Sequence, residues 1–78
     1  MNTIEKRFGE AVRRRREQLG LSQEDFADKA GIHRTYVSSI ELGKVQVSIG
    51  IADKLARALE KPLSKIWREI EKAADTHH

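Results

Sequence analysis

Apolar side chains recur every three or four residues along most of the chain, a spacing that predicts helices. Glycine follows each of the first three apolar stripes, and Lys61-Pro62 follows the fourth. Ser22 and Ser48 stand where helix N-caps are expected. No segment has the alternation of a strand. The predicted helices cover residues 4–19, 23–30, 33–42, the stretch from Ser48 to just before Lys61, and 63–74. We therefore expect an all-α fold, a compact five-helix bundle.

The length allows one small domain. A chain of 78 residues buries about 60% of its extended surface on folding, so residues 1–78 are expected to form a single domain that ends in a polar tail at about 75–78. Because there is no cysteine, the core must hold without disulfides, which suits the reducing cytoplasm. No apolar run approaches the ~20 residues of a membrane span, and no membrane partner is expected. His77 and His78 fit the tail; a weak metal site and a purification-tag remnant are the alternatives.

Positive charge is concentrated near the start of the chain. Residues 1–20 carry six Lys or Arg and three Asp or Glu, whereas residues 21–78 carry nine of each. Four consecutive arginines occupy positions 13–16, and at about 100° per residue they spread around a helix, so at least one must face inward. Arg13, Arg14 and Arg15 form either a solvated face or part of a surface that binds a polyanion.

Residues 23–42 have the arrangement of a helix-turn-helix. Two helices that cross steeply need a small residue at their closest approach, which Ala27 supplies, and a turn residue that tolerates positive φ, which Gly31 supplies. Val37 and Ile40 return from the second helix of the motif to the core. This motif is typical of DNA-binding proteins.

The chain from about Ala11 to Leu59 resembles the XRE-type helix-turn-helix family of phage repressors and Cro proteins. The resemblance is carried by the runs LGLSQEDFA at 19–27 and IELGK at 40–44. It implies a lambda repressor-like DNA-binding domain. It also implies that Gln23, at the N-terminus of its helix, contacts a backbone phosphate, and that Arg16 pairs with Glu41 in the interior.

The third predicted helix has one polar and one apolar face. Its polar side chains are short except for one arginine, which suits a helix in the major groove, where Arg can bridge guanine O6 and N7. We expect this face to read bases, with a merely solvated helix face as the alternative. For Tyr36, a phosphate contact and packing against the preceding helix stay equally open. The expected base-reading residues are Arg34, Thr35, Ser38 and Ser39.

More polar residues gather after this helix. Lys44, Gln46 and Ser48 lie where an ammonium group and the N–H groups of the next helix would meet a phosphate. We expect them to clamp the DNA backbone. One of Val45 and Val47, which interrupt the polar run, is expected to fill the core.

A single module of this size makes too few contacts to select one site in a genome. We therefore expect a homodimer that reads an inverted repeat with half-sites about one helical turn apart, with its interface on the fourth and fifth helices. The apolar stripe of the fifth helix is expected to serve as core, as dimer interface, or as both. It consists of Leu63, Ile66, Trp67 and Ile70.

Within the family, the run RTYVSSIE at 34–41 and the short length most resemble controller proteins of restriction-modification systems, which activate and repress their own operon. The expected function is therefore a sequence-specific regulator that binds a double-stranded DNA operator in the bacterial cytoplasm, at the nucleoid, with RNA polymerase as a further candidate partner. A phage or plasmid repressor and an antitoxin-like regulator are alternatives, as is a protein-interaction module that does not bind DNA. Three histidines and no cysteine offer no nucleophile–base set, so no enzyme, cofactor or metal is expected.

Overall fold

The computed structural model describes residues 3–75, and their side chains as far as residue 72. Within that range the chain forms five helices and no strand, which confirms the expected all-α architecture. The predicted tail beyond Asp75, with His77 and His78, lies outside the described residues. The helices are α1 (Ile4–Gln18), α2 (Gln23–Ala30), α3 (Arg34–Glu41), α4 (Ile49–Ala58) and α5 (Leu63–Asp75).

The ends of the helices follow from local capping. The Ser22 hydroxyl accepts the backbone N–H of Asp25 at 3.0 Å, and the Ser48 hydroxyl accepts that of Ile51 at 3.1 Å, so both predicted N-caps are confirmed. Gly31 ends α2 with a φ of 73°, as the turn of the motif requires. These contacts set where α2 begins and ends and where α4 begins.

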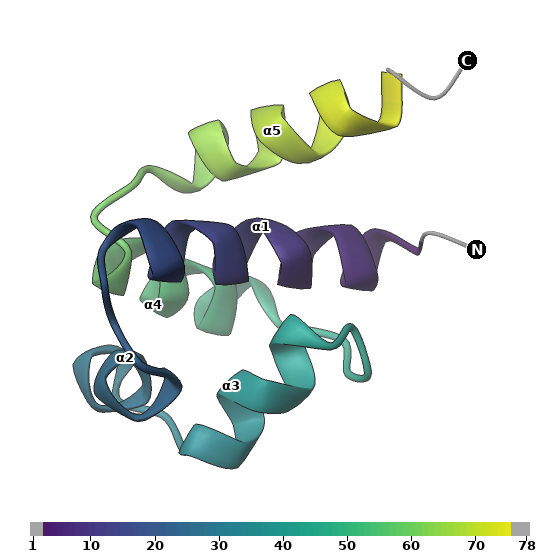
Figure 1. Ribbon diagram of the computed structural model, residues 1–78. Coiled ribbons are helices and arrows are strands. Elements are labelled where there is room, and N and C mark those ends of the chain that lie inside the picture. The colour runs from purple at the N-terminus through teal and green to yellow at the C-terminus, as the bar shows by residue number, and fades with distance from the viewer. Residues whose placement is uncertain (1–2, 76–78) are drawn as a thin grey trace.

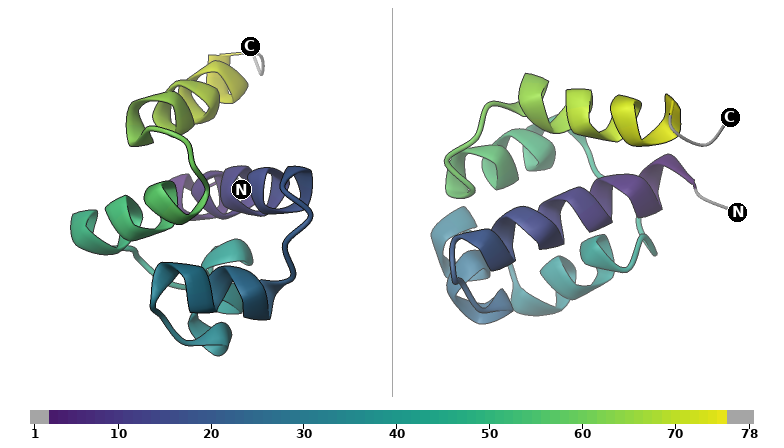
Figure 2. Two further views of the ribbon diagram at one scale, coloured as in Figure 1. Left: turned by 90° about the vertical axis from the view of Figure 1, so that its left-hand side faces the viewer. Right: turned by 45° about the horizontal axis from the view of Figure 1, so that its top comes forward.

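The helices pack on both sides of α1. Figure 1 shows α5 along one side of α1, with α2 and α3 on the other, and Figure 2 shows α4 beside α1, between α5 and α2. Contacts join α1 to α3 and α5, α2 to α3 and α4, and α4 to α5. The largest fully buried side chains are those of Phe26, Ile40, Leu55, Leu59, Ile66, Ile70, Val12 and Val37. Every helix contributes to this one core.

A glycine lets α1 cross the end of α3 in direct backbone contact. A Cβ atom added to Gly9 would overlap the carbonyl oxygen of Ile40 and lie 2.7 Å from that of Glu41. Just beyond α3, Gly43 has a φ of 72°, and a Cβ there would lie 2.6 Å from the Cα of Lys6. The C-terminal end of α3 is therefore held against the first turns of α1.

The four residues of the apolar stripe on α5 differ in how deeply they are buried. Ile66 and Ile70 are 1% and 2% exposed, so these two side chains serve the core, one of the two roles expected of the stripe, and offer almost no surface to a dimer partner. Leu63 is half-buried against the same core. Trp67 is 40% exposed, with its ring centroid 6.0 Å from that of Phe8. Only the edge of the stripe is available to another molecule.

Candidate nucleic-acid interface

The polar face of α3 points outward because the apolar face of the same helix is buried in the core. Val37 and Ile40 are each 1% exposed in the core, whereas Arg34 and Thr35 are exposed. Ser38 and Ser39 are half-buried farther along the helix. In Figure 1, α3 forms the lower edge of the molecule, away from α5. The four expected base readers therefore share one accessible helix.

Tyr36 lies on the other side of this helix. Its side chain is half-buried and packs against the hydrophobic core. This packing corresponds to one of its two expected positions, and a phosphate contact of Tyr36 stays a prediction.

His33 is a functional candidate that the sequence pattern did not single out beyond its place at a helix start. It is the N-cap of α3, where its Nδ1 accepts the backbone N–H of Thr35 at 3.2 Å. The same nitrogen lies 2.7 Å from the Thr35 hydroxyl oxygen. Imidazole is not among the usual N-cap groups, which are the side chains of Ser, Thr, Asp and Asn, so the pattern gave little reason to expect this contact.

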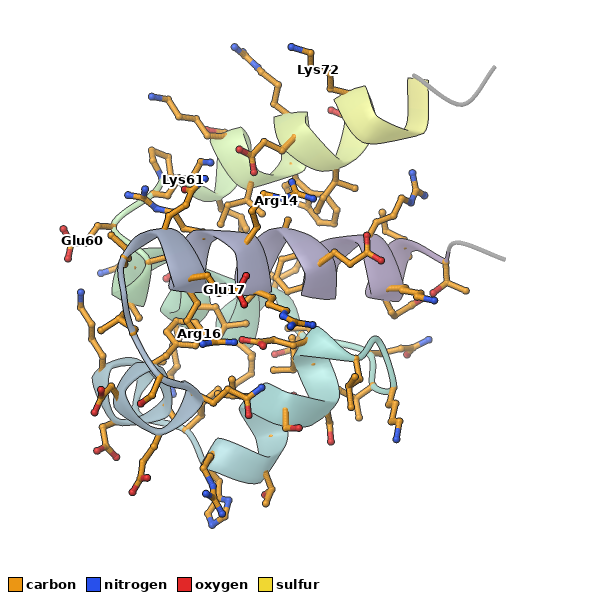
Figure 3. All side chains as sticks on the ribbon, viewed as in Figure 1. Arg14, Arg16, Glu17, Glu60, Lys61 and Lys72 are labelled. Carbon is orange, nitrogen blue, oxygen red and sulfur yellow. The ribbon has the colours of Figure 1, made fainter. Side chains whose placement is uncertain are left out.

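Arg16 and Glu41 meet in the interior as the family resemblance implies. The Arg16 Nε donates to one carboxylate oxygen of Glu41 at 2.7 Å, and Nη2 donates to the other at 3.0 Å. The two side chains are 11% and 3% exposed. The hydrogen bond to Glu41 raises the pKa of Arg16, although burial acts in the opposite direction. Arg16 also donates to the Leu21 carbonyl at 2.8 Å, so one guanidinium joins α1, the turn before α2, and α3 (Figure 3).

Gln23 belongs to the same network, which its position in the sequence did not reveal. Its side-chain amide donates to Glu41 at 3.1 Å. Because this amide has a second N–H, it can still donate to a phosphate while Glu41 holds its orientation. Glu41 thus anchors a predicted DNA-contacting side chain of α2 as well as the end of α3.

The α3–α4 loop presents the other expected phosphate contacts. Lys44 and Gln46 are exposed. The Ser48 hydroxyl accepts the N–H of Ile51 as a cap, and its own proton is left to donate. Val45 and Val47 are both half-buried against the core, where we expected only one of them. The two valines anchor the loop and leave its polar side chains outward.

The other three arginines of the run at 13–16 are placed differently. Arg13 forms an exposed ion pair with Glu17 at 3.4 Å, and Arg15 donates to the Leu59 carbonyl at 3.0 Å. Arg14 lies on the side of α1 that faces α5, away from α3 (Figure 3). These three side chains therefore add little to the face that α3 presents.

The described residues bring together no group of three or more potential metal ligands from His, Cys, Asp and Glu. None of the helices between residues 3 and 75 combines the length and apolar character needed to cross a membrane.

Comparison with known proteins agrees with this geometry. The sequence model of the helix-turn-helix family matches residues 12–66. Control protein C.MunI from Mycoplasma sp is 44% identical over 73 residues, which cover 92% of this chain and 99% of that protein. The crystal structure of the restriction-modification controller protein C.AhdI from Aeromonas hydrophila has a TM-score of 0.76 at 38% identity, over 78% of this chain and 92% of that one.

Similarity to a further solved structure supports the fold only. The restriction-modification controller protein C.Esp1396I, solved as a tetramer in complex with its natural 35 base-pair operator, has a TM-score of 0.84 at 24% identity, over 92% of this chain and 95% of that one. The identities to C.MunI and C.AhdI confirm the controller proteins among the groups that the sequence resemblance left open. The chain belongs to the helix-turn-helix family of DNA-binding transcriptional regulators, among the controller proteins of restriction-modification systems, and is not an enzyme.

Proposed function

We propose that this regulator binds an inverted-repeat operator as a homodimer and controls the operon that encodes it. The observation that carries the proposal is the division of α3 into a buried apolar back and an accessible polar face. With the back fixed in the core, α3 can enter the major groove as a rigid element. Arg34 is its principal reader, since an exposed guanidinium at the start of the helix can bridge O6 and N7 of a guanine.

Phosphate contacts on either side of α3 would set its register in the groove. Gln23 supports one side from the N-terminus of α2, with its amide oriented by Glu41. Lys44, Gln46 and Ser48 support the other side from the α3–α4 loop. Contacts of this kind position a protein on DNA without reading its sequence.

An apolar side of the molecule supports the homodimer. A hollow of about 220 Å³ lies between α1, α4, α5 and the α3–α4 loop. Trp67 and Ile4, two of its lining residues, are 40% and 41% exposed. The complete lining is Ile4, Glu5, Phe8, Gln46, Val47, Ala52 and Trp67.

This side is also in a suitable place for a two-fold pair. In Figure 1 the start of α1 and the α3–α4 loop lie on the same side of the molecule, while α3 lies along the lower edge. Pairing two copies through that side leaves both α3 helices on a shared lower face, as a two-fold reader of DNA requires. We therefore assign Trp67 to the dimer interface, in place of the wider stripe first expected.

Assembly on DNA has support from a protein of the same fold, since C.Esp1396I occupies its operator as a tetramer. Binding within the regulated operon would place the dimer beside RNA polymerase, the further partner in this proposal. The chain would act on DNA at the bacterial nucleoid, in the cytoplasm.

Selection of bound sites from a random duplex pool tests the proposal. We expect an inverted repeat whose half-sites lie about one helical turn apart, since that spacing matches two α3 helices on one face of DNA. Binding to random duplex should be weaker and should fall steeply with salt, because it depends on phosphate neutralisation. A recovered site without two-fold symmetry would refute the dimeric reading, and failure to bind any duplex at low salt would refute the proposal as a whole.

A further inference from the structure

The N-terminal end of α3 holds a hydrogen-bond cluster that includes an expected base reader. The Nδ1 atom of His33 accepts the backbone N–H of Thr35 and also lies 2.7 Å from the Thr35 Oγ1. Both residues are exposed on the part of α3 that we place in the groove. The hydroxyl that could read a base is therefore already engaged with a neighbour.

The backbone contact fixes the direction of the second hydrogen bond. A backbone N–H can only donate, so Nδ1 of His33 presents a lone pair and the imidazole proton lies on Nε2. With Nδ1 as an acceptor, a hydroxyl oxygen 2.7 Å away directs its proton toward the same lone pair as the shorter branch of a bifurcated hydrogen bond, because two facing lone pairs would repel each other. Thr35 thus has its one hydroxyl proton turned toward His33 and its oxygen lone pairs turned outward.

We infer that His33 makes Thr35 a hydrogen-bond acceptor only, so that Thr35 selects a base that carries an exocyclic amino group. In the major groove, adenine N6 and cytosine N4 donate hydrogen bonds, whereas guanine O6 and thymine O4 accept them. A free threonine hydroxyl can meet either kind of base, but one tied to His33 can meet only the first. The inference rests on the proposed placement of α3 in the groove.

His33 is a positioning residue in this arrangement, because it acts on the base through Thr35. Its removal must therefore be separated from the loss of the helix cap. His33→Gly removes the imidazole, and glycine is tolerated at an N-cap far better than alanine, so α3 should persist. His33→Asn supplies a new acceptor at the cap and serves as the conservative replacement. Thr35→Val removes the hydroxyl and keeps the shape of the side chain.

The test begins with an operator selected by the wild-type protein. The base that Thr35 contacts is identified by repeating the selection with Thr35→Val. It is the operator position at which the wild-type protein prefers one base and this variant does not. That base is then exchanged for the one that carries a carbonyl in place of the amino group: guanine for adenine, or uracil for cytosine, which adds no methyl group. Gel-shift titrations give the affinity of each variant for the two duplexes, and circular dichroism melts verify that each variant is folded.

We expect the exchange to weaken the wild type by roughly two- to tenfold more than it weakens Thr35→Val, the effect of one hydrogen bond. His33→Asn should show the same penalty as the wild type. His33→Gly should lose most of the penalty, because its freed hydroxyl can turn and donate to the carbonyl.

Three results would overturn the inference: an undiminished penalty in His33→Gly, a wild-type preference for the carbonyl base, or no position in the operator that responds to Thr35→Val. Each of them leaves operator selection intact and so leaves the proposed function standing. A wild-type protein that selects no operator would overturn both.

Discussion

Replacement of Glu41 by alanine should remove much of the stability of the domain. Glu41 is the buried charged residue of the described core, at 6% exposed. Its carboxylate accepts two hydrogen bonds from Arg16 and one from Gln23. In the alanine variant Arg16 keeps its bond to the Leu21 carbonyl but loses its counter-ion. The variant therefore leaves a cation in the interior that no longer joins α1 to α3.

The size of the effect follows from this burial. Breaking a buried ion pair by removing one partner costs about 3–5 kcal/mol. Domains are stable by about 0.05–0.15 kcal/mol per residue, which is roughly 4–12 kcal/mol for a chain of this length. At about 4–8 °C per kcal/mol for small domains, the Tm should fall by more than about 10 °C.

Urea and thermal unfolding followed by circular dichroism measure the loss. Arg13→Ala is the matched control, because the Arg13–Glu17 pair is exposed, with side chains 61% and 56% accessible, and such pairs contribute only about 0–1 kcal/mol. Exchange of both buried partners, Arg16→Met with Glu41→Leu, should recover part of the stability because no charge is then stranded. If Glu41→Ala unfolded within about 1 kcal/mol of the Arg13→Ala control, the buried pair would not be what fixes α3 to α1.

Four further changes test other parts of the account. Gly9→Ala should destabilise the domain by about 1–3 kcal/mol in urea unfolding, because its Cβ overlaps the backbone at the end of α3; unchanged stability would mean that the two helices separate at no cost. Arg34→Ala should weaken binding to the selected operator by about 1–3 kcal/mol and change binding to random duplex little, whereas equal losses on both would assign Arg34 to a phosphate. Lys44→Ala should weaken all duplexes alike and reduce the salt slope by about one, and a change in sequence preference instead would contradict its phosphate role. Trp67→Glu should shift sedimentation toward the monomer while the thermal melt still shows a folded domain; an unaltered dimer would place the interface elsewhere.

The helices could be predicted from the sequence because their ends are encoded locally. Ser22, Ser48 and Gly31 cap or end a helix through contacts with residues at most four positions away, so spacing along the chain is enough to locate them. The division of α3 into two faces follows in the same way from helical periodicity and the burial of Val37 and Ile40.

Contacts between distant segments could not be predicted in this way. An apolar stripe does not say whether it faces its own core or a second molecule, and the expected interface therefore included Ile66 and Ile70, which lie inside. Glycine disfavours helix formation, so the sequence gives no reason for Gly9 in the middle of α1. The close packing of α1 against the end of α3 explains why glycine is needed there. The Gln23–Glu41 hydrogen bond spans 18 positions and involves a residue that the family resemblance assigned to DNA alone.

Methylation interference on the selected operator tests the central claim most directly, that the polar face of α3 reads base edges in the major groove. Methylation of guanine N7 blocks the edge that an arginine would bridge. The account predicts that one methylated guanine in each half-site prevents binding of the wild-type protein and that the interference disappears in Arg34→Ala. Interference that persists in Arg34→Ala, or a complex that forms equally well on every methylated duplex, would contradict it.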